Sequence, residues 1–361
     1  MNPTQQLHDL GQSLWLDNIT RGLLTSGTLG DYISKLSITG LTSNPSIFDL
    51  AIKDSGFYDD AIRQKTKEGK TGEKLFFELA LEDLSQAADL FRPIYDSTAG
   101  VDGWVSLEVS PLLAYDAHST VQAAVGLRAQ GHRHNIFIKI PGTAEGLAAI
   151  EQTIFEGVPV NVTLLFSSAQ YVAAAEAYLR GIERRIDAGL HPRVRSVASM
   201  FISRWDKAVA GKVSHELQNT LGIAIAQRAY KAYRDLLASP RWQRAFEAGA
   251  QPQRLLWAST GTKDPAASDV LYIKALAAPD TINTIPEKTL LAFADHGVPG
   301  NVMPVDGGNC ERVIAAFAKA GIDDAKLATD LQREGADSFV TAWKDLLGCI
   351  EAKAAALSKA A

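Results

Sequence analysis

The pattern that most constrains the fold of this chain is an alternation of short apolar segments with longer stretches of helical periodicity. Each short segment ends in a polar or small-residue loop, and apolar residues at helical spacing follow it. Repeated strand-helix units form parallel sheets, and eight of them predict a closed (β/α)8 TIM barrel of the α/β class. The eight expected strands are residues 14–17, 38–43, 104–109, 135–140, 158–164, 194–200, 255–259 and 281–284.

Two parts of the sequence are longer than a plain eight-unit barrel requires. Residues 46–102 separate the second and third predicted strands by more than one crossover helix, so we expect an additional pair of helices there. Residues 311–361 are helical in pattern and become rich in alanine, which predicts helices that cover one end of the barrel. No stretch rich in glycine, serine or proline divides the chain, so we expect a single barrel domain over residues 1–361.

Composition and charge exclude several classes of protein. The 361 residues are 46% hydrophobic and 21% charged, as in a globular protein, and the net charge of −5 argues against nucleic acid as the main partner. No apolar stretch reaches membrane-spanning length and the polar opening is unlike a signal peptide, so we expect a cytoplasmic protein without membrane contact. Cys310 and Cys349 have no metal-ligand spacing, and we expect reduced thiols and no metal site.

One charged residue interrupts an apolar strand. Lys139 lies in residues 135–141, NIFIKIP, which otherwise predict a buried strand that ends at a proline-glycine turn. Burial removes hydration from the ammonium ion and lowers the pKa of a lysine, and a neutral amine attacks a carbonyl to form a Schiff base. Lys139 is therefore a candidate covalent catalyst. The alternative is that it lies just past the strand and extends its ammonium group to water.

Further polar residues stand where the predicted strands end. In a TIM barrel the reactive groups project from the carboxyl ends of the strands, so residues far apart in the sequence meet there. Two carboxylates and a lysine within apolar strands are harder to explain structurally than asparagine or serine at strand ends. The candidate site residues are Asp17, Asn44, Glu108, Lys139, Asn161, Thr163, Ser199, Arg204, Ser259 and Lys263.

Three motifs carry a resemblance to the transaldolase family. Residues 40–48, GLTSNPSIF, and residues 136–147, IFIKIPGTAEGL, are similar to transaldolase signatures, and residues 161–167, NVTLLFS, resemble the fifth-strand motif of the family. The longer, bacterial-type branch fits best, on residues 14–18, LWLDN, and residues 256–260, LWAST. The resemblance extends, with decreasing sharpness, from about Leu14 to the last predicted strand.

The resemblance implies a transferase that moves a three-carbon dihydroxyacetone unit without a cofactor. Its partners would be sugar phosphates of the non-oxidative pentose phosphate pathway: sedoheptulose 7-phosphate or fructose 6-phosphate as donor, and glyceraldehyde 3-phosphate or erythrose 4-phosphate as acceptor. By the same resemblance, Lys139 forms the Schiff base and Glu108 moves protons through a water held with Thr163. Asp17 takes the proton of the substrate's fourth-carbon hydroxyl. On its residues alone, Asp17 is equally well interpreted as a helix N-cap.

The resemblance assigns the other candidates to substrate binding. Asn44 and Ser199 match positions that hold hydroxyl groups of the three-carbon unit, a task for neutral hydrogen-bonding side chains. Asn161 is expected to support the same end of the substrate. None of these three residues needs to change its protonation state.

The phosphate is expected to lie near two cationic residues. Arg204 matches the family's phosphate-binding arginine, although the usual run Ser-Pro-Phe-x-Gly-Arg reads SMFISR at residues 199–204. The alternative for Arg204 is an exposed helix-start residue paired with Asp206. Ser259 and Lys263, in the loop after the seventh strand, offer a hydroxyl and a cation for the second side of the phosphate.

Two other functions remain open at the level of sequence. A transaldolase-like fructose 6-phosphate aldolase would release dihydroxyacetone, but those relatives are shorter and carry a tyrosine where this chain has Glu108. A barrel without catalysis would serve as a binding or assembly module, which the intact lysine and carboxylates argue against. The sequence leaves open whether the protein is a monomer or a homodimer.

Overall fold

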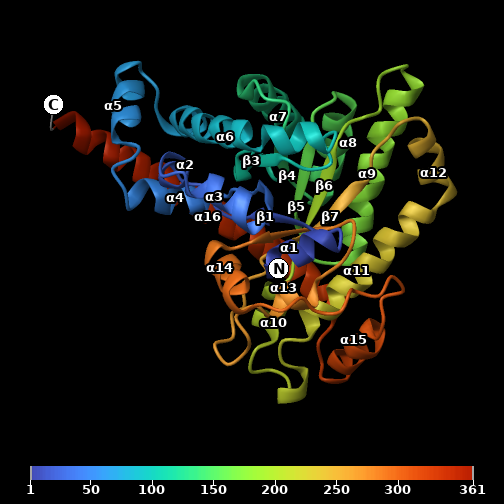
Figure 1. Cartoon of the computed structure of the whole chain (residues 1–361). Helices are drawn as coiled ribbons and strands as arrows, with labels where there is room; N and C mark the ends of the chain where they lie inside the picture. The colour runs from blue at the N-terminus through green and yellow to red at the C-terminus, as the bar shows by residue number, and fades with distance from the viewer. Residues whose placement is uncertain (1, 360–361) are drawn as a thin grey trace.

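The computed structural model describes residues 2–359, and its centre is a closed barrel of eight parallel strands (Figure 1). Each strand pairs with its neighbours in the sequence, and β8 closes the ring on β1. This confirms the predicted (β/α)8 barrel. Met1, and Ala360 and Ala361 at the end of the predicted helical stretch, lie outside the described residues. The strands are β1 (Ser13–Leu16), β2 (Ile38–Leu41), β3 (Trp104–Glu108), β4 (Ile136–Pro141), β5 (Val160–Leu165), β6 (Ser196–Phe201), β7 (Gln253–Ala258) and β8 (Ile282–Ile285).

The observed strands differ from the predicted ones only at their ends. Asp17 and Ser259 lie just past β1 and β7, and Ser259 has a φ of 56°, a left-handed conformation that cannot continue a strand. Strand β7 begins two residues before its predicted start, because Gln253 and Arg254 still pair with β6. Both are polar, so a search for apolar runs misses them.

The helices surround the barrel and add to it at two places. Three helices, α4, α5 and α6, lie between β2 and β3, and two, α15 and α16, follow the last barrel unit, as the sequence predicts. Two short 3-10 helices occupy Pro111–Leu113 and His215–Leu217. The α-helices of the described residues are α1 (Pro3–Asp9), α2 (Arg21–Thr25), α3 (Thr28–Leu36), α4 (Pro45–Lys53), α5 (Asp59–Lys67), α6 (Gly72–Ser97), α7 (Ala117–Gly131), α8 (Ala144–Phe155), α9 (Ser168–Asp187), α10 (Ser203–Val209), α11 (Leu221–Ala238), α12 (Pro240–Glu247), α13 (Leu271–Ala275), α14 (Glu287–His296), α15 (Cys310–Lys319) and α16 (Asp324–Lys359).

Three aromatic rings fill the inside of the barrel. The rings of Trp104 and Phe137 stack with centroids 4.0 Å apart, and the ring of Trp15 lies 6.2 Å from that of Phe137. Gly40 on β2 makes room for them, since a Cβ atom there would lie 2.7 Å from the Trp15 ring. The Trp15 indole nitrogen donates a 2.7 Å hydrogen bond to Asp102. We call Trp15, Trp104 and Phe137 the aromatic layer.

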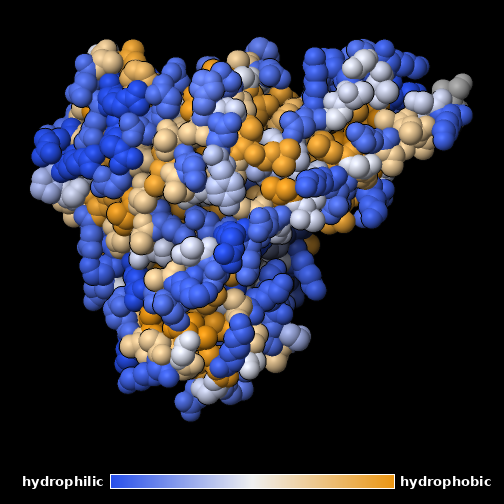
Figure 2. Space-filling model, turned by 180° about the vertical axis from the view of Figure 1, so that it is seen from behind, coloured by the Kyte–Doolittle hydropathy of each residue, from blue (hydrophilic) through white to orange (hydrophobic). Residues whose placement is uncertain are grey.

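The long helix α16 connects the barrel to a protruding arm. It packs against α4 and α5, and its end lies with them at the far side of the molecule from α12 (Figure 1). Lys353 holds the arm together through an ion pair with Asp59, at 2.9 Å, and a hydrogen bond to the main-chain oxygen of Ile52. Leu50 and Phe57 are exposed on this part of the chain, and Figure 2 shows hydrophobic side chains gathered along the arm.

Two further expectations concern the membrane and the cysteines. Among the described helices, none has the length and apolar character needed to cross a membrane. Cys310, in α15, and Cys349, in α16, are both free thiols, as the sequence predicts.

Candidate active site

Lys139 and Glu108 lie side by side near the carboxyl ends of β4 and β3, because the register of the two strands places them opposite each other. The Nζ atom of Lys139 is 3.1 Å from Oε2 of Glu108 and 3.3 Å from the main-chain oxygen of Ser43. The two side chains are only 7% and 4% exposed. The alternative in which Lys139 extends into water is therefore wrong.

Glu108 and Thr163 each keep one polar atom free of the protein. Oε1 of Glu108 and Oγ1 of Thr163 are buried and form no hydrogen bond with a described residue. Burial raises the pKa of Glu108 above its ordinary value, although the positive charge of Lys139 acts in the opposite direction. A carboxyl group whose pKa is shifted toward neutrality is suited to exchange protons with a neighbouring group.

Asp17 reaches the same site from the end of β1. Its main-chain nitrogen continues the β8 ladder with a 2.8 Å bond to the oxygen of Ile285, and its carboxylate accepts a 2.9 Å bond from the Thr42 hydroxyl. Burial raises its pKa, while the charge of Lys139 and the Thr42 hydroxyl act to lower it. The alternative of Asp17 as a helix N-cap is wrong, because Thr20 caps the next helix, α2.

The three amide and hydroxyl candidates have different positions. Asn161 lies beside Lys139 on β5 and is fully buried; its oxygen accepts a 2.7 Å bond from the Ser199 hydroxyl. It therefore orients Ser199, which lines the cavity described below. Asn44 follows β2 and caps α4, since its side-chain oxygen accepts a 3.1 Å bond from the nitrogen of Ile47.

Two cations without a carboxylate partner lie near one another at this end of the barrel. Arg204 begins α10, and its guanidinium stands 5.2 Å from the centre of the Phe201 ring, with no ion pair to a described residue. Asp206 does not pair with it, because its carboxylate binds the Tyr272 hydroxyl and main-chain nitrogens of α11. Burial lowers the pKa of Arg204. Lys263 is exposed and likewise has no ion pair among the described residues.

These residues surround a cavity of about 220 Å³, which we call the mouth cavity. Eight of the ten predicted site residues line it; Glu108 and Asn161 do not, but each bonds to a residue that does. The Ser259 hydroxyl lies 2.9 Å from that of Ser203. The predicted residues in its lining are Asp17, Asn44, Lys139, Thr163, Ser199, Arg204, Ser259 and Lys263.

The structure adds lining residues that the sequence did not single out. Phe339, in α16, places its ring 5.5 Å from Nζ of Lys139. Thr42 bonds to Asp17 and, at 2.6 Å between hydroxyl oxygens, to Thr284. Thr42 belongs to the GLTSN motif and could have been found there, whereas nothing in the helical pattern around Phe339 indicates that it covers a site.

The sequence of the chain also matches a known protein family. The sequence model of the family described as Transaldolase/Fructose-6-phosphate aldolase matches residues 14–350 of the chain. The chain belongs to this family. The matched range includes the barrel strands, apart from Ser13 at the start of β1, and most of α16.

Relatives of this member of the transaldolase/fructose-6-phosphate aldolase family match it along nearly its full length. A protein named Transaldolase from Arthrobacter sp. (strain FB24) is 42% identical over 367 residues, which cover 99% of each chain. Proteins with the same name from Frankia alni (strain DSM 45986 / CECT 9034 / ACN14a) and Thermobifida fusca (strain YX) are each 41% identical, with at least 96% of every chain covered.

The site of this family member combines one amine, two carboxylates and two unpaired cations. The two carboxylates have different contacts: Glu108 contacts the Lys139 amine directly, whereas Asp17 lines the mouth cavity and accepts a hydrogen bond from Thr42. Such an arrangement suits chemistry in which a lysine bonds to a carbonyl carbon and separate acids move separate protons. The described residues contain no cluster of histidine, cysteine, aspartate and glutamate that could hold a metal ion.

Proposed function

We propose that this protein is a transaldolase that transfers a dihydroxyacetone unit from a ketose phosphate to an aldose phosphate through a Schiff base on Lys139. The donors are sedoheptulose 7-phosphate or fructose 6-phosphate, and the acceptors are glyceraldehyde 3-phosphate or erythrose 4-phosphate. The observation that carries the proposal is the buried Lys139 beside Glu108, in a cavity that Asp17 also lines. The family match supports it.

Formation of the Schiff base begins with the lysine. Glu108, 3.1 Å away, takes a proton from the Lys139 ammonium group, and the neutral amine attacks the ketone carbon of the donor. The resulting carbinolamine loses water to give an iminium ion. The free oxygen of Glu108 and the free hydroxyl of Thr163 would hold the water that carries these protons, which supports a positioning role for Thr163.

Cleavage of the carbon-carbon bond requires a second base. The Asp17 carboxylate takes the proton of the fourth-carbon hydroxyl, the bond between the third and fourth carbons breaks, and its electrons move into the iminium group to form an enamine. The aldose leaves, and the enamine then attacks the aldehyde carbon of the acceptor while Asp17 returns the proton. Hydrolysis of the new iminium ion releases the product and restores Lys139.

Substrate binding uses the remaining residues of the mouth cavity. Asn44 and Ser199 bind hydroxyls of the three-carbon unit, and Asn161 fixes the orientation of Ser199. Arg204 and Lys263, which have no ion pair among the described residues, bind the phosphate, with Ser259 beside them. We further propose that the protein acts in the cytoplasm as a single-domain monomer or homodimer, with sugar phosphates as partners and without a metal or cofactor.

Chemical trapping tests the covalent step. Sodium borohydride is added in the presence of fructose 6-phosphate, and peptides are analysed by mass spectrometry. We expect a reduced dihydroxyacetone adduct on Lys139, no adduct in Lys139→Met, and an unchanged adduct in Lys344→Met, which changes an exposed lysine. A folded wild-type protein that forms no adduct on Lys139 would contradict the proposal and favour a binding module.

A product assay separates the transferase from an aldolase. The family description includes fructose-6-phosphate aldolase, so both outcomes need measurement. With fructose 6-phosphate and erythrose 4-phosphate, we expect sedoheptulose 7-phosphate as the main product. If free dihydroxyacetone instead accumulates as fast as fructose 6-phosphate is consumed, while erythrose 4-phosphate is left unchanged, the protein is an aldolase.

A further inference from the structure

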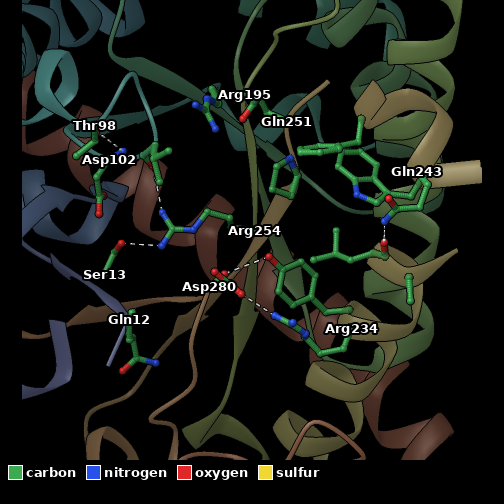
Figure 3. A pocket seen from close by; sticks show the side chains of 18 of the residues that line it. Gln12, Ser13, Thr98, Asp102, Arg195, Arg234, Gln243, Gln251, Arg254 and Asp280 are labelled. Atoms are coloured by element: carbon green, nitrogen blue, oxygen red, sulfur yellow. Dashed lines mark hydrogen bonds and ion pairs between the residues drawn. The ribbon is translucent and has the colours of Figure 1, made fainter. Parts of the chain in front are cut away.

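A second cavity, of about 730 Å³, opens at the opposite end of the barrel, where the strands begin. We call it the floor cavity. It lies between the starts of β1, β6, β7 and β8 and the helices α11 and α12 (Figure 3). Its volume is within the range of small-molecule sites in proteins. The proposed transaldolase reaction makes no use of this end of the molecule.

Two buried arginines without carboxylate partners line the floor cavity. Arg195 and Arg254 are 9% and 8% exposed, and neither forms an ion pair with a described residue. Arg254 donates to the main-chain oxygens of Val101 and Thr281 and to the Ser13 hydroxyl, at 2.6–3.1 Å. Arg195 donates only once within the described residues, from Nη2 to the oxygen of Ala99 at 2.9 Å, so its other nitrogens stay available for a ligand.

The charges around these arginines leave the cavity positive. Asp280 lines it too, but its carboxylate pairs with Arg234 at 2.6 Å. Asp102 accepts the Trp15 indole N–H. Burial, together with the neighbouring positive charges of Arg193 and Arg254, lowers the pKa of Arg195 to about 10. A buried guanidinium ion without a counter-charge is costly, and an anion beside it would remove that cost.

The opposite wall of the floor cavity is aromatic. Trp242 and Phe246 of α12 line it, with ring centroids 6.5 Å apart, and the Phe246 side chain is largely exposed. Gln12, on the strand side, has a buried amide oxygen that accepts no hydrogen bond from a described residue. The cavity thus offers two cations, two aromatic rings tilted by 42° to each other, and the free amide oxygen of Gln12.

We propose that the floor cavity binds a small organic phosphate that carries a planar ring, of the nucleoside monophosphate class. Its phosphate contacts Arg195 and Arg254, and its ring lies against Trp242 and Phe246. This site is separate from the mouth cavity, and the proposal does not depend on the reaction catalysed there.

Calorimetric titration with adenosine 5′-monophosphate tests this proposal. We expect one molecule to bind per chain, and Arg195→Gln to weaken binding by about tenfold or more, as loss of a charged hydrogen bond does. Arg195→Lys, which keeps the charge, restores part of the affinity. Phe246→Ala weakens binding of adenosine 5′-monophosphate but leaves binding of inorganic phosphate unchanged. Circular dichroism verifies that each variant is folded.

Two control variants make the result specific. Arg312→Gln removes an exposed arginine of α15 that does not line the cavity and should change the affinity by less than about twofold. Arg204→Ala removes a cation of the mouth cavity and should leave binding intact. The proposal is wrong if Arg204→Ala abolishes binding while Arg195→Gln does not. It is also wrong if folded protein binds neither adenosine 5′-monophosphate nor inorganic phosphate at millimolar concentration.

Discussion

At the scale of single residues, the mouth cavity depends on groups that water reaches poorly. Lys139 and Glu108 form a buried pair, and such pairs are a weak source of stability, because removing two charges from water costs about as much as their attraction returns. Their presence in an apolar barrel is therefore better explained by chemistry than by folding. The raised pKa of Glu108 has the same burial as its cause.

Glu108→Gln tests proton transfer while it keeps the size of the side chain. We expect the turnover number to fall by about a hundredfold or more, since the amide cannot accept the lysine proton. Steady-state kinetics measure this, and far-UV circular dichroism verifies the fold. Glu145→Gln, an exposed change in the first turn of α8, should leave turnover unaltered. Near-normal turnover in Glu108→Gln would show that another group takes the proton.

Asp17→Asn tests the cost of burying a carboxylate. Because burial raises the pKa of Asp17, the folded protein binds the proton of this carboxyl group more tightly than the unfolded chain does. The protonated carboxyl group therefore stabilises the fold at low pH, and this contribution is lost as the pH rises through the folded-state pKa. We therefore expect the variant to gain stability relative to wild type as the pH rises above the ordinary aspartate pKa of 3.8, until Asp17 ionises in the folded protein. Urea denaturation at several pH values measures the difference, with the exposed Asp54→Asn as control. A difference that is constant with pH would contradict the shift.

Arg204→Ala tests the proposed phosphate contact. We expect mainly a higher KM for phosphorylated donors, because the guanidinium binds the substrate and the transition state alike. Steady-state kinetics with fructose 6-phosphate measure the change, and Lys207→Ala, an exposed change in the same helix, is the matched control. A lower turnover number with an unaltered KM would give Arg204 a different role.

At the scale of elements, α16 is the helix that completes the mouth cavity. Gln332 donates 2.9 Å hydrogen bonds to the main-chain oxygens of Gly142 and Leu164, which follow β4 and lie in β5. One turn on, Gly335 allows close approach, since a Cβ there would lie 3.0 Å from the Leu164 side chain. The Trp343 indole then donates to Glu73 of α6 at 2.9 Å. These contacts hold Phe339 above the lysine.

Gln332→Ala tests this attachment. The change leaves two carbonyl groups without their donor, so we expect the free energy of unfolding to fall by about 1–3 kcal/mol. Chemical denaturation measures the loss. Asp337→Ala, an exposed position five residues further along the same helix, should change stability by no more than about 0.5 kcal/mol. An equal effect of both variants would show that Gln332 contributes nothing specific.

At the scale of the whole molecule, the aromatic layer lies between two cavities. Phe137 stands two residues before Lys139 on β4 and so faces the same side of the strand, whereas Trp15 bonds to Asp102, which lines the floor cavity. The interior of the barrel is therefore packed, as expected for a small barrel, and the two ends are separate.

Phe137→Ala tests the packing of this layer. Removal of a fully enclosed ring leaves a void, and we expect a loss of about 3–5 kcal/mol in the free energy of unfolding. Denaturation in urea measures it. Phe57→Ala, which changes an exposed ring on the arm, should have little effect. A loss below about 1 kcal/mol for Phe137→Ala would mean that the barrel interior repacks around the void.

The sequence predicts this molecule best where the chemistry is local. The strand-helix alternation predicts the barrel. It also places Lys139 and Glu108 near the carboxyl ends of neighbouring strands, so the two side chains are expected to meet, as the strand register shows. It fails where a contact joins distant segments: the helical pattern around Phe339 does not indicate that α16 lies over β4 and β5. The floor cavity is not predicted for a related reason: Arg195 directly precedes β6 and Arg254 is the second residue of β7, and nothing in the pattern of either segment indicates that the two side chains line one cavity.

The direction of α16 also matters for handling the protein. Its last turns lie on the arm beside α4 and α5, away from the barrel, whereas α1 lies at the other end of the chain and contributes His8 to the floor cavity (Figure 1). A linker that tethers the protein to a solid support is therefore better attached after α16 than before α1. Tethered in this way, both cavities stay open to small molecules.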